Sequence, residues 1–513
     1  MSRFIGMTIH KLGLEAGGMT LSMLRRASLF AKHGWRAAVI TTEPRPGYDH
    51  VARVFADRGE LSDGATIINI WDFARSYYEP HPEGAAPVPS ASNDWFGVPI
   101  GGDTASLRYF EKGTNVYREY WDYDRSGRLR FRDVFDYSHR RLSRIEYDHS
   151  GAPWRQSDFD ADGSRIRQDR FFTRSGIPFI TRWFNVSNGQ VDRAFIFPLM
   201  SLSAIEFKSQ AELQAHIYSL ISEGSDGLPV FVGDGIGSVD SLRLLPSQKT
   251  IRLMFFHSNH YSGSRALGAR VKSDHLRVLR AGGDIDGIVA LTPQQAADIR
   301  AEYPSAPPIF VVPHSLHFTD RVSDAGVRNP YRVIFLGRLA PEKRVVEIVH
   351  AFAPVARRFP QAELVIVGSG PTWEDVEAAV AELELVDRVT FRGWLPRAEA
   401  ELAAAGMMVV ASDFEGYAMT IGESLIQETP VVSFDLPYGP RAQLGDFGGL
   451  LVPYLDFAAL SDALCALMAD PARARRLGVQ GRQWVLRARG ESRVFATWLS
   501  IFEELDARKG ATG

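Results

Sequence analysis

One segment of the chain predicts a strand, a loop and a helix in succession: Met407-Met408-Val409-Val410-Ala411-Ser412-Asp413-Phe414-Glu415-Gly416-Tyr417-Ala418-Met419-Thr420-Ile421-Gly422-Glu423-Ser424-Leu425-Ile426-Gln427-Glu428. The apolar run at its start predicts a buried strand, so Glu415 lies past a carboxyl end, where open parallel sheets bind ligands. Glu423 then lies one turn into the helix, whose free amides and dipole favour an anion. We therefore expect a phosphate flanked by hydroxyl-bearing rings that the two carboxylates hold, as in a nucleotide-sugar.

Length and composition set the bounds of this interpretation. The chain has 513 residues and 45% hydrophobic content, whereas a single core rarely grows beyond about 250–300 residues, so we expect more than one domain. The net charge of −3 is small for this length and argues against nucleic acid as a partner.

Features that report on compartment favour the cytoplasm. Cys465 is the single cysteine and lies in an apolar helical pattern, which predicts a core residue in a reducing compartment. The first ten residues lack the long apolar region of a signal peptide, and no stretch of about 18 apolar residues occurs. We expect a cytoplasmic protein, at most peripheral on the inner face of the membrane.

The first 74 residues predict a βαβ unit. A strand at Phe4–Ile9 precedes Gly17-Gly18, an amphipathic helix from Met19 to His33, and a second strand near Ala37. This order favours a parallel sheet.

From about Arg108 to Phe197 the pattern changes to short aromatic-rich runs between tight turns. Glycine follows Ser, Asp or Asn at positions 127, 151, 163, 176 and 189, at intervals of 12 or 13 residues after a first interval of 24. One strand and one turn in each interval give an antiparallel meander. Its aromatic and arginine residues either offer a face to a partner subunit or polymeric acceptor, or cover the sheet's own core.

Helix and strand alternation resumes after the meander and continues to the end of the chain. We predict an N-terminal Rossmann-like domain from 1–74 and 206–325, an inserted β-sheet domain at 75–205, a C-terminal nucleotide-sugar-binding domain at 326–490 and a C-terminal helix at 491–513. The stretch from Pro313 to Pro330 has turn residues without a clear period, so it is the predicted linker.

A second loop after a predicted strand carries basic residues. Arg338 and Lys343 lie five positions apart, between the apolar strand ending at Leu336 and the helix beginning at Val345. An arginine fork and a lysine point charge in that position can clamp one diphosphate.

Four ordered motifs together resemble the retaining glycosyltransferases of family 4, which have the GT-B fold. They are Gly337-Arg338-Leu339-Ala340-Pro341-Glu342-Lys343, Val367-Gly368-Ser369-Gly370-Pro371, Phe391-Arg392-Gly393-Trp394 and the Glu415 to Glu423 pair with seven residues between them. The resemblance implies two Rossmann-like doubly wound α/β domains that face a cleft, with the β-meander inserted in the N-terminal one.

The resemblance also implies roles for single residues in the C-terminal domain. Arg338 and Lys343 would hold the donor diphosphate and stabilise the leaving nucleotide. Glu415 would hold hydroxyls of the transferred sugar, and Glu423 the ribose. Backbone amides at Met419 and Thr420 would complete the phosphate site.

In the N-terminal domain the resemblance points to two further places. Gly17 and Gly18 match the family's glycine loop near the donor phosphates, and His257 matches a histidine near the transferred sugar. Ala418 departs from the pattern, because such loops commonly carry a second glycine there. Neither Asp284-Ile285-Asp286 nor Asp160-Ala161-Asp162 forms a convincing metal site, so we expect no metal and no cofactor besides the donor substrate.

The insertion narrows the resemblance to poly(glycerol-phosphate) α-glucosyltransferases of wall teichoic acid and accessory-secretion glycosyltransferases. It implies transfer of glucose or N-acetylglucosamine, with retention, from a uridine diphosphate sugar to a hydroxyl of a polymeric polyol phosphate or of a protein Ser or Thr. In those relatives the sheet serves oligomerisation or acceptor binding, so a homo-oligomer is expected. A non-catalytic GT-B-like subunit of a glycosyltransferase complex is the alternative.

Overall fold

The computed structural model describes residues 2–14, 17–79, 94–100, 106–112, 114, 116–198, 201, 203–262, 269–316, 327–445 and 447–510. Contacts divide it into two compact units: unit 1 comprises Met1–Ala16 and Phe30–Arg252, and unit 2 comprises Gly17–Leu29 and Leu253–Gly513. Helix α1 (Gly18–Lys32) and strand β15 (Ile251–Phe255) run from one unit into the other.

Unit 1 contains a parallel sheet, as the βαβ pattern predicts. Its strands, in the spatial order β14-β1-β2-β3, are β14 (Val230–Gly233), β1 (Phe4–Ile9), β2 (Arg36–Thr41) and β3 (Ala65–Asn69). Every residue of β1 is buried, which is typical of a strand covered on both faces. Most of α1 belongs to unit 2. The other helices of unit 1 are α2 (Tyr48–Asp57), α3 (Ile70–Tyr78), α4 (Gln210–Ile221) and α5 (Val239–Arg243), with the short 3-10 turn η1 (Ile236–Ser238).

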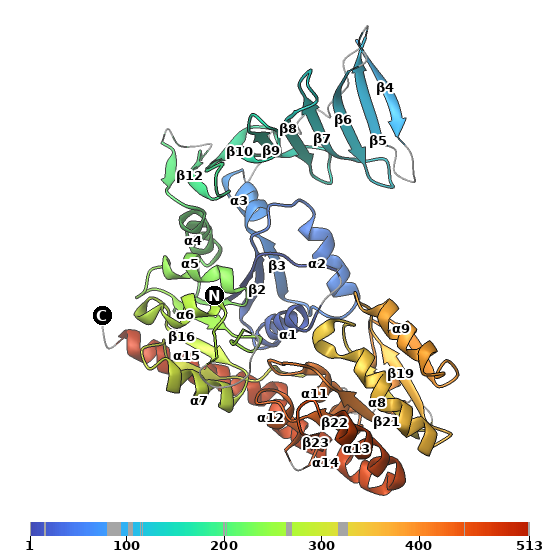
Figure 1. The fold of residues 1–513 in the computed structure, drawn as a ribbon. Helices are drawn as coiled ribbons and strands as arrows, with labels where there is room; N and C mark the ends of the chain where they lie inside the picture. The colour runs from blue at the N-terminus through green and yellow to red at the C-terminus, as the bar shows by residue number, and fades with distance from the viewer. Residues whose placement is uncertain are drawn as a thin grey trace. The chain divides into compact units, whose positions relative to one another are not determined.

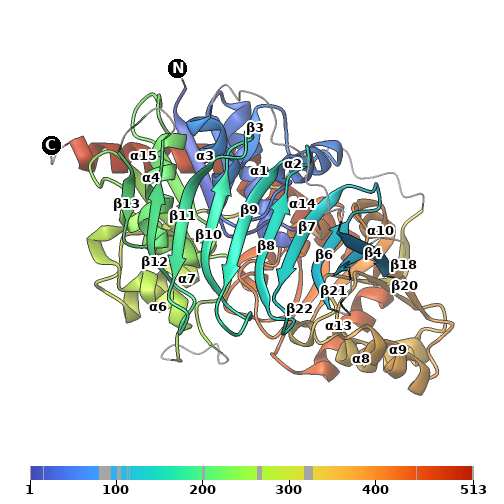
Figure 2. The same cartoon turned by 90° about the horizontal axis from the view of Figure 1, so that it is seen from above.

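The insertion is one antiparallel sheet of ten strands in unbroken sequence order (Figures 1 and 2). The strands are β4 (Trp95–Ile100), β5 (Ser106–Glu111), β6 (Tyr117–Tyr123), β7 (Leu129–Phe135), β8 (Arg141–Tyr147), β9 (Pro153–Phe159), β10 (Ile166–Phe172), β11 (Pro178–Phe184), β12 (Val191–Ile196) and β13 (Ile205–Phe207). The predicted limits of the meander, Arg108 and Phe197, are therefore too narrow. The first strand carries Gly97 and Pro99, which sequence rules disfavour in strands but which an edge strand tolerates.

The turns of this sheet repeat with a fixed period, which explains the interval of 24 residues between Gly127 and Gly151. Asp124, Asp136, Asp148 and Asp160 begin successive turns twelve residues apart. In each turn the aspartate Oδ1 accepts backbone N–H groups, as Asp136 does from Ser138 and Arg140 at 2.8 and 3.0 Å. His139 has a φ of 59° and fills the left-handed position that glycine holds in the neighbouring turns, so the interval of 24 residues contains two units.

Aromatic and arginine side chains of the insertion largely contact one another. Arg144 donates to Asp133 at 2.7 Å and lies 3.9 Å from the Phe131 ring centre, and Tyr117 packs edge-on against Phe135. These contacts favour a role in the sheet's own packing. Large apolar side chains are exposed on the edge strand β4, where Phe96 is 58% exposed, and at other places of the insertion, such as Tyr137 and Ile177.

The insertion is joined to α3 by a buried polar cluster within unit 1. Asp169 is fully buried and accepts from Arg155 Nε and Arg182 Nε, each at 2.9 Å. The Arg182 guanidinium lies 4.5 Å from the centre of the Trp71 ring of α3, and Trp71 stacks on Phe171 of β10. The sheet is therefore fixed to the parallel domain by matched charge and stacked rings.

Unit 2 contains two groups of parallel strands. One group is β15, β16 (Gly287–Ala290) and β17 (Ile309–Val311), with helices α6 (Ser273–Leu279) and α7 (Pro293–Glu302) and the 3-10 turn η2 (Gly282–Asp284). The other is a six-stranded sheet in the order β20-β19-β18-β21-β22-β23. Its strands are β18 (Asn329–Leu336), β19 (Glu363–Val367), β20 (Val389–Gly393), β21 (Ala405–Val410), β22 (Val431–Phe434) and β23 (Gly449–Val452).

Helices cover both faces of the six-stranded sheet, and two buried apolar clusters fill the layers. The helices are α8 (Val345–Arg358), α9 (Trp373–Glu382), α10 (Glu399–Ala404), α11 (Met419–Ile426), α12 (Pro440–Leu444), α13 (Phe457–Ala469) and α14 (Pro471–Arg489), with the 3-10 turn η3 (Pro341–Lys343). Cys465 lies in one of these clusters, as predicted. The doubly wound α/β pattern with an inserted meander is confirmed.

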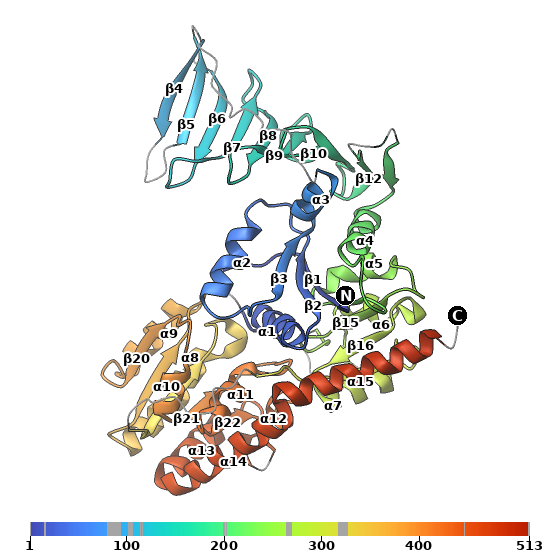
Figure 3. The same cartoon turned by 180° about the vertical axis from the view of Figure 1, so that it is seen from behind.

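The chain ends in the long helix α15 (Glu491–Gly510), drawn in red in Figure 3. It contacts the β15 to β17 group, because Trp498 packs near Phe255 and Lys509 pairs with Asp286 at 2.6 Å. In the described parts of the chain we find no helix with the length and apolar character needed to cross a membrane.

The predicted domain boundaries stay a prediction. Strand β13 continues two residues past the predicted end of the insertion at 205, and most of the predicted linker, residues 317–326, lies outside the described residues.

Candidate active site

The strand order of the six-stranded sheet indicates where a ligand would bind. From β18 the chain moves outward to β19 and β20, then returns to place β21 on the other side of β18. Open α/β sheets bind ligands beyond the carboxyl ends of the strands at such a reversal. The loops after β18 and β21 hold Arg338, Lys343 and Glu415, so three predicted residues lie at this point.

Lys343 and Glu415 form a direct ion pair. Lys343 Nζ lies 2.5 Å from Glu415 Oε1, and the two side chains are 22% and 12% exposed. Ser412 Oγ donates to the same carboxylate oxygen at 2.7 Å. The sequence prediction assigned these two groups separate tasks and did not anticipate that they would contact each other.

The loop after β18 is held in shape next to Lys343. Arg344 has the left-handed φ of 52°, and its Nε donates to Asp413, while the Asp413 N–H donates to Glu342 O at 2.7 Å. These bonds tie the loops after β18 and β21 together. Arg338 points elsewhere, because its Nη2 donates to Glu342 at 2.5 Å and its side chain is 67% exposed.

Gly416 lets the loop after β21 approach the residues after β15. A Cβ at this position would lie 2.0 Å from His257 O, so no larger residue fits. The His257 ring stacks on Phe255 and lies 5.3 Å from the ring of His314. Burial, together with nearby His257 and Arg26, holds the pKa of His314 well below its ordinary value, so His314 is neutral at pH 7.

Helix α11 begins at Met419, after Ala418 in the left-handed conformation with a φ of 56°. This conformation favours glycine, which fits the glycine that related loops have there. A Cβ on Gly18 would lie 3.4 Å from Met419 Sδ, so the glycine loop before α1 lies beside the start of α11. The structure thus brings Gly18 and Met419 together.

Glu423 faces a cation that the sequence prediction missed. Arg25 Nη1 of α1 lies 3.5 Å from Glu423 Oε1, and the side chains are 26% and 28% exposed. The two residues are 398 positions apart in the sequence. The one available hint in the sequence was that Arg25 lies about two helical turns after Gly18, on the predicted helix that follows this glycine.

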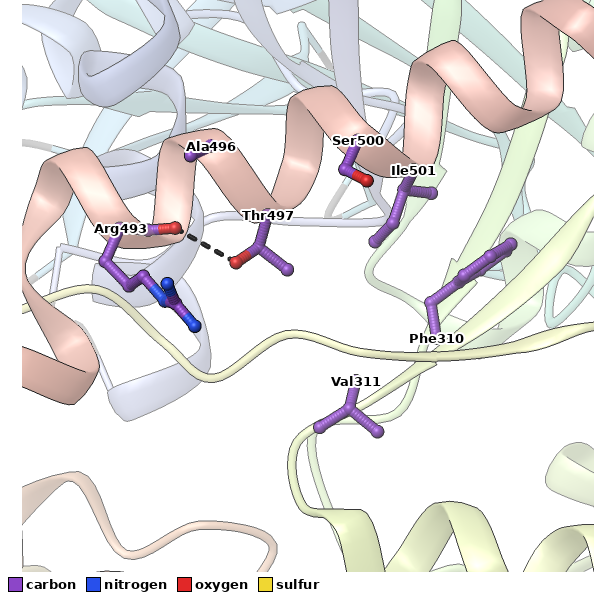
Figure 4. Close-up of a pocket in the computed structure, with 7 residues that line it drawn as sticks. All are labelled: Phe310, Val311, Arg493, Ala496, Thr497, Ser500 and Ile501. Carbon is purple, nitrogen blue, oxygen red and sulfur yellow. Dashed lines mark hydrogen bonds between the residues drawn. The ribbon is translucent and has the colours of Figure 1, made fainter.

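A separate pocket of about 390 Å³ lies between α15 and β17 (Figure 4). Phe310, Val311 and Arg493 line it with Ala496, Thr497, Ser500 and Ile501. None of the predicted site residues lies in this lining. The pocket is therefore distinct from the reversal point of the sheet.

Comparison with known proteins gives a family match for part of the chain. Residues 319–484 match the family described as Glycosyl transferases group 1. Over these residues the chain resembles a group 1 glycosyl transferase, and the site just described lies in and beside that matched segment.

One relative and one solved structure match nearly the whole chain. Poly(ribitol-phosphate) alpha-N-acetylglucosaminyltransferase of Staphylococcus aureus is 21% identical over 505 residues, covering 97% of this chain and 99% of that protein. The crystal structure of a mutant of S. aureus TarM in complex with fondaparinux, alpha-GlcNAc-glycerol and UDP has a TM-score of 0.84 at 20% identity, covering 98% and 99%.

A second similar structure is the pneumococcal O-GlcNAc transferase GtfA in complex with UDP and GlcNAc. Its TM-score is 0.69 at 18% identity, with 98% of this chain and 99% of that chain covered. Together these likenesses confirm the predicted fold, insertion included.

Proposed function

We propose that this glycosyltransferase moves glucose or N-acetylglucosamine, with retained configuration, from a uridine diphosphate sugar to a hydroxyl of a polymeric acceptor. The observation that carries the proposal is the Lys343–Glu415 pair, 2.5 Å apart, beside the N-terminus of α11, which carries Glu423. A cation for a diphosphate, a carboxylate for sugar hydroxyls and free helix amides are what a nucleotide-sugar requires.

Each residue has a task in this proposal. Lys343 and Arg338 stabilise the charge that grows on the departing diphosphate. For this task Arg338 exchanges its exposed contact with Glu342 for the phosphate. Glu415 accepts hydrogen bonds from the sugar, and Glu423 from the ribose. No metal is needed, because the two cations supply the charge.

The amides of Met419 and Thr420 and the glycine loop at Gly17 and Gly18 surround the same phosphates in this proposal. His257 lies near the transferred sugar in this proposal. The departing phosphate itself accepts the proton of the incoming hydroxyl, on the face where the bond to the anomeric carbon breaks and the new one forms. The reaction then needs no covalent intermediate.

A thermal-shift screen tests the donor class, since a ligand that binds the folded state raises its stability in proportion to affinity and concentration. We expect uridine diphosphate sugars to raise the melting temperature more than the guanosine and adenosine analogues, in buffer with EDTA. Transfer to poly(ribitol phosphate), poly(glycerol phosphate) and a Ser-rich peptide then identifies the acceptor. Failure of every nucleotide-sugar to bind or be hydrolysed would favour the non-catalytic subunit.

We further propose that the chain forms a homo-oligomer through the edge of the insertion. Strand β4 lies at the end of the sheet, and its side chains Phe96 and Val98 are 58% and 47% exposed. An unpaired edge with exposed apolar groups is a template for a second strand. Peripheral attachment to the inner face of the membrane, where a lipid-linked polymer would be presented, belongs to the same proposal.

A further inference from the structure

Arg489 is a buried charge beneath the start of helix α11. It is the last residue of α14 and is completely buried. Its Nε donates to His314 O at 3.0 Å and its Nη1 to Gln443 Oε1 at 2.6 Å. In the described part of the chain Nη2 has no hydrogen-bond partner, and no carboxylate forms an ion pair with this arginine. The charge of Glu423 acts on this guanidinium, but its hydrogen-bond partners are neutral. Burying a charge without an ion pair is costly, so we expect Arg489 to have a function.

Gln443 links Arg489 to the two residues before α11, Tyr417 and the left-handed Ala418. Its Nε2 donates to Tyr417 O, and also to Ala418 O at 3.2 Å. The Arg489 guanidinium in turn lies 4.5 Å from the Tyr417 ring centre. Ala418 has a backbone conformation that a residue with a Cβ adopts only when its surroundings impose it. The Arg489–Gln443 pair provides that restraint.

The same arginine fits closely against the helix itself. A Cβ on Gly422, the fourth residue of α11, would lie 1.9 Å from Arg489 Nη1. Glycine at this position lets the guanidinium reach the underside of the first helical turn. The positive charge therefore lies close to the amides of that turn, whose free N–H groups already favour an anion.

Arg489 also contacts the segment behind His257. Leu316 N donates to Arg489 O at 3.3 Å, and Arg489 Nε holds His314 O, while the His314 ring lies 5.3 Å from that of His257. Arg489 thus connects the segment of His314 and Leu316 with the start of α11.

We propose that Arg489 is a positioning residue for the donor diphosphate. Through Gln443 it fixes the Tyr417–Ala418 corner so that the amides of Met419 and Thr420 face the phosphates, and its charge adds to the positive potential there. This inference rests on the proposed function and assigns to it a residue outside the family motifs.

The test compares Arg489→Lys, Gln443→Leu and the double variant in the full chain. Arg489→Lys keeps the charge and loses the fork, whereas Gln443→Leu keeps the arginine and loses the link. Titration calorimetry with uridine diphosphate measures affinity, and hydrogen exchange reports on the amides of residues 419–421. Arg482→Lys is the matched control, because Arg482 is on the same helix and its Nη1 donates to Ile426 O at the other end of α11.

We expect each single substitution to weaken binding about tenfold, the effect of losing one charge-assisted hydrogen bond, and to speed exchange at those amides. If the two residues act as one link, the double variant is weakened by much less than the product of the single effects. The control should stay within about twofold of the wild type, as expected for a substitution without a role at the site. If Arg489→Lys does not fold, Gln443→Leu gives the same two readouts.

The outcomes separate the two proposals. Wild-type protein that binds no uridine diphosphate would overturn the proposed function and this inference with it. Wild-type protein that binds, together with single variants of unchanged affinity, would overturn only the role of Arg489. Fully multiplicative effects in the double variant would overturn the link through Gln443.

Discussion

Replacing Lys343 by methionine removes one charge and almost no volume. In the free protein this lysine is the cation of Glu415, at 2.5 Å. After the substitution the carboxylate keeps only Ser412 Oγ at 2.7 Å among the partners described above. An incompletely satisfied, largely buried carboxylate costs about 1–3 kcal/mol of stability, which urea unfolding measures.

The catalytic effect should be larger than the effect on donor binding. Lys343 would meet its greatest negative charge in the transition state, where the sugar–phosphate bond is breaking. Loss of one preorganised group at a developing charge costs about 2.7–4 kcal/mol, or about 100- to 1,000-fold in kcat. Initial rates at saturating donor and acceptor give kcat, and calorimetry with uridine diphosphate gives the ground-state affinity.

Two further variants complete the experiment. Glu415→Gln frees Lys343 from its partner, so uridine diphosphate should bind at least as tightly as to the wild type while kcat falls. Lys249→Met, at an exposed lysine of unit 1, should leave kcat unchanged. A kcat for Lys343→Met within about threefold of the wild type, an effect below 1 kcal/mol, would refute the role of this lysine in leaving-group departure.

Three other substitutions test the structure at different levels. Gly416→Ala places a Cβ 2.0 Å from His257 O, so it should lower kcat/KM at least about tenfold by displacing the loop; steady-state kinetics with wild-type rates would contradict this contact. Burial raises the pKa of Asp72 from 3.8 to about 6, so the stability that its protonated form contributes is complete below about pH 4 and is lost as the pH rises through 6. Asp72→Asn should therefore stabilise the protein at pH 8 by about 2–3 kcal/mol and change little at pH 4, and equal shifts in urea midpoint at both pH values would count against it. Phe96→Lys on the edge strand should lower the mass seen by light scattering if β4 forms the oligomer, with Tyr137→Lys, at an exposed residue of a turn, as the control; an unchanged mass would exclude that edge.

Most element types could be predicted because they depend on local pattern. The strand expected at Phe4–Ile9 consists mostly of apolar residues, and the structure reproduces its limits. The turns of the insertion were predictable from glycine, and the recurring aspartate three positions earlier would have located the one turn in which His139 replaces that glycine. Strand β4 was missed because its glycine and proline oppose strand formation except at an edge.

The contacts that hold the candidate site could not be predicted in the same way. Glu415 was expected from the motif, but its pairing with Lys343 joins loops 72 positions apart. Arg25 and Arg489 belong to no motif, since they act on the helix beginning at Met419 from two other helices. Local periodicity contains no information on such pairs, which exist only once the domain has folded.

The twelve-residue turn period has an evolutionary consequence. One strand and one turn recur as a twelve-residue cassette, so a duplication or loss of twelve residues lengthens or shortens the sheet by one strand and reverses the direction of the next. Loss or gain of two cassettes restores every strand's direction. The surface that the sheet presents can therefore be enlarged or trimmed in steps of 24 residues without a change in the six-stranded sheet of unit 2.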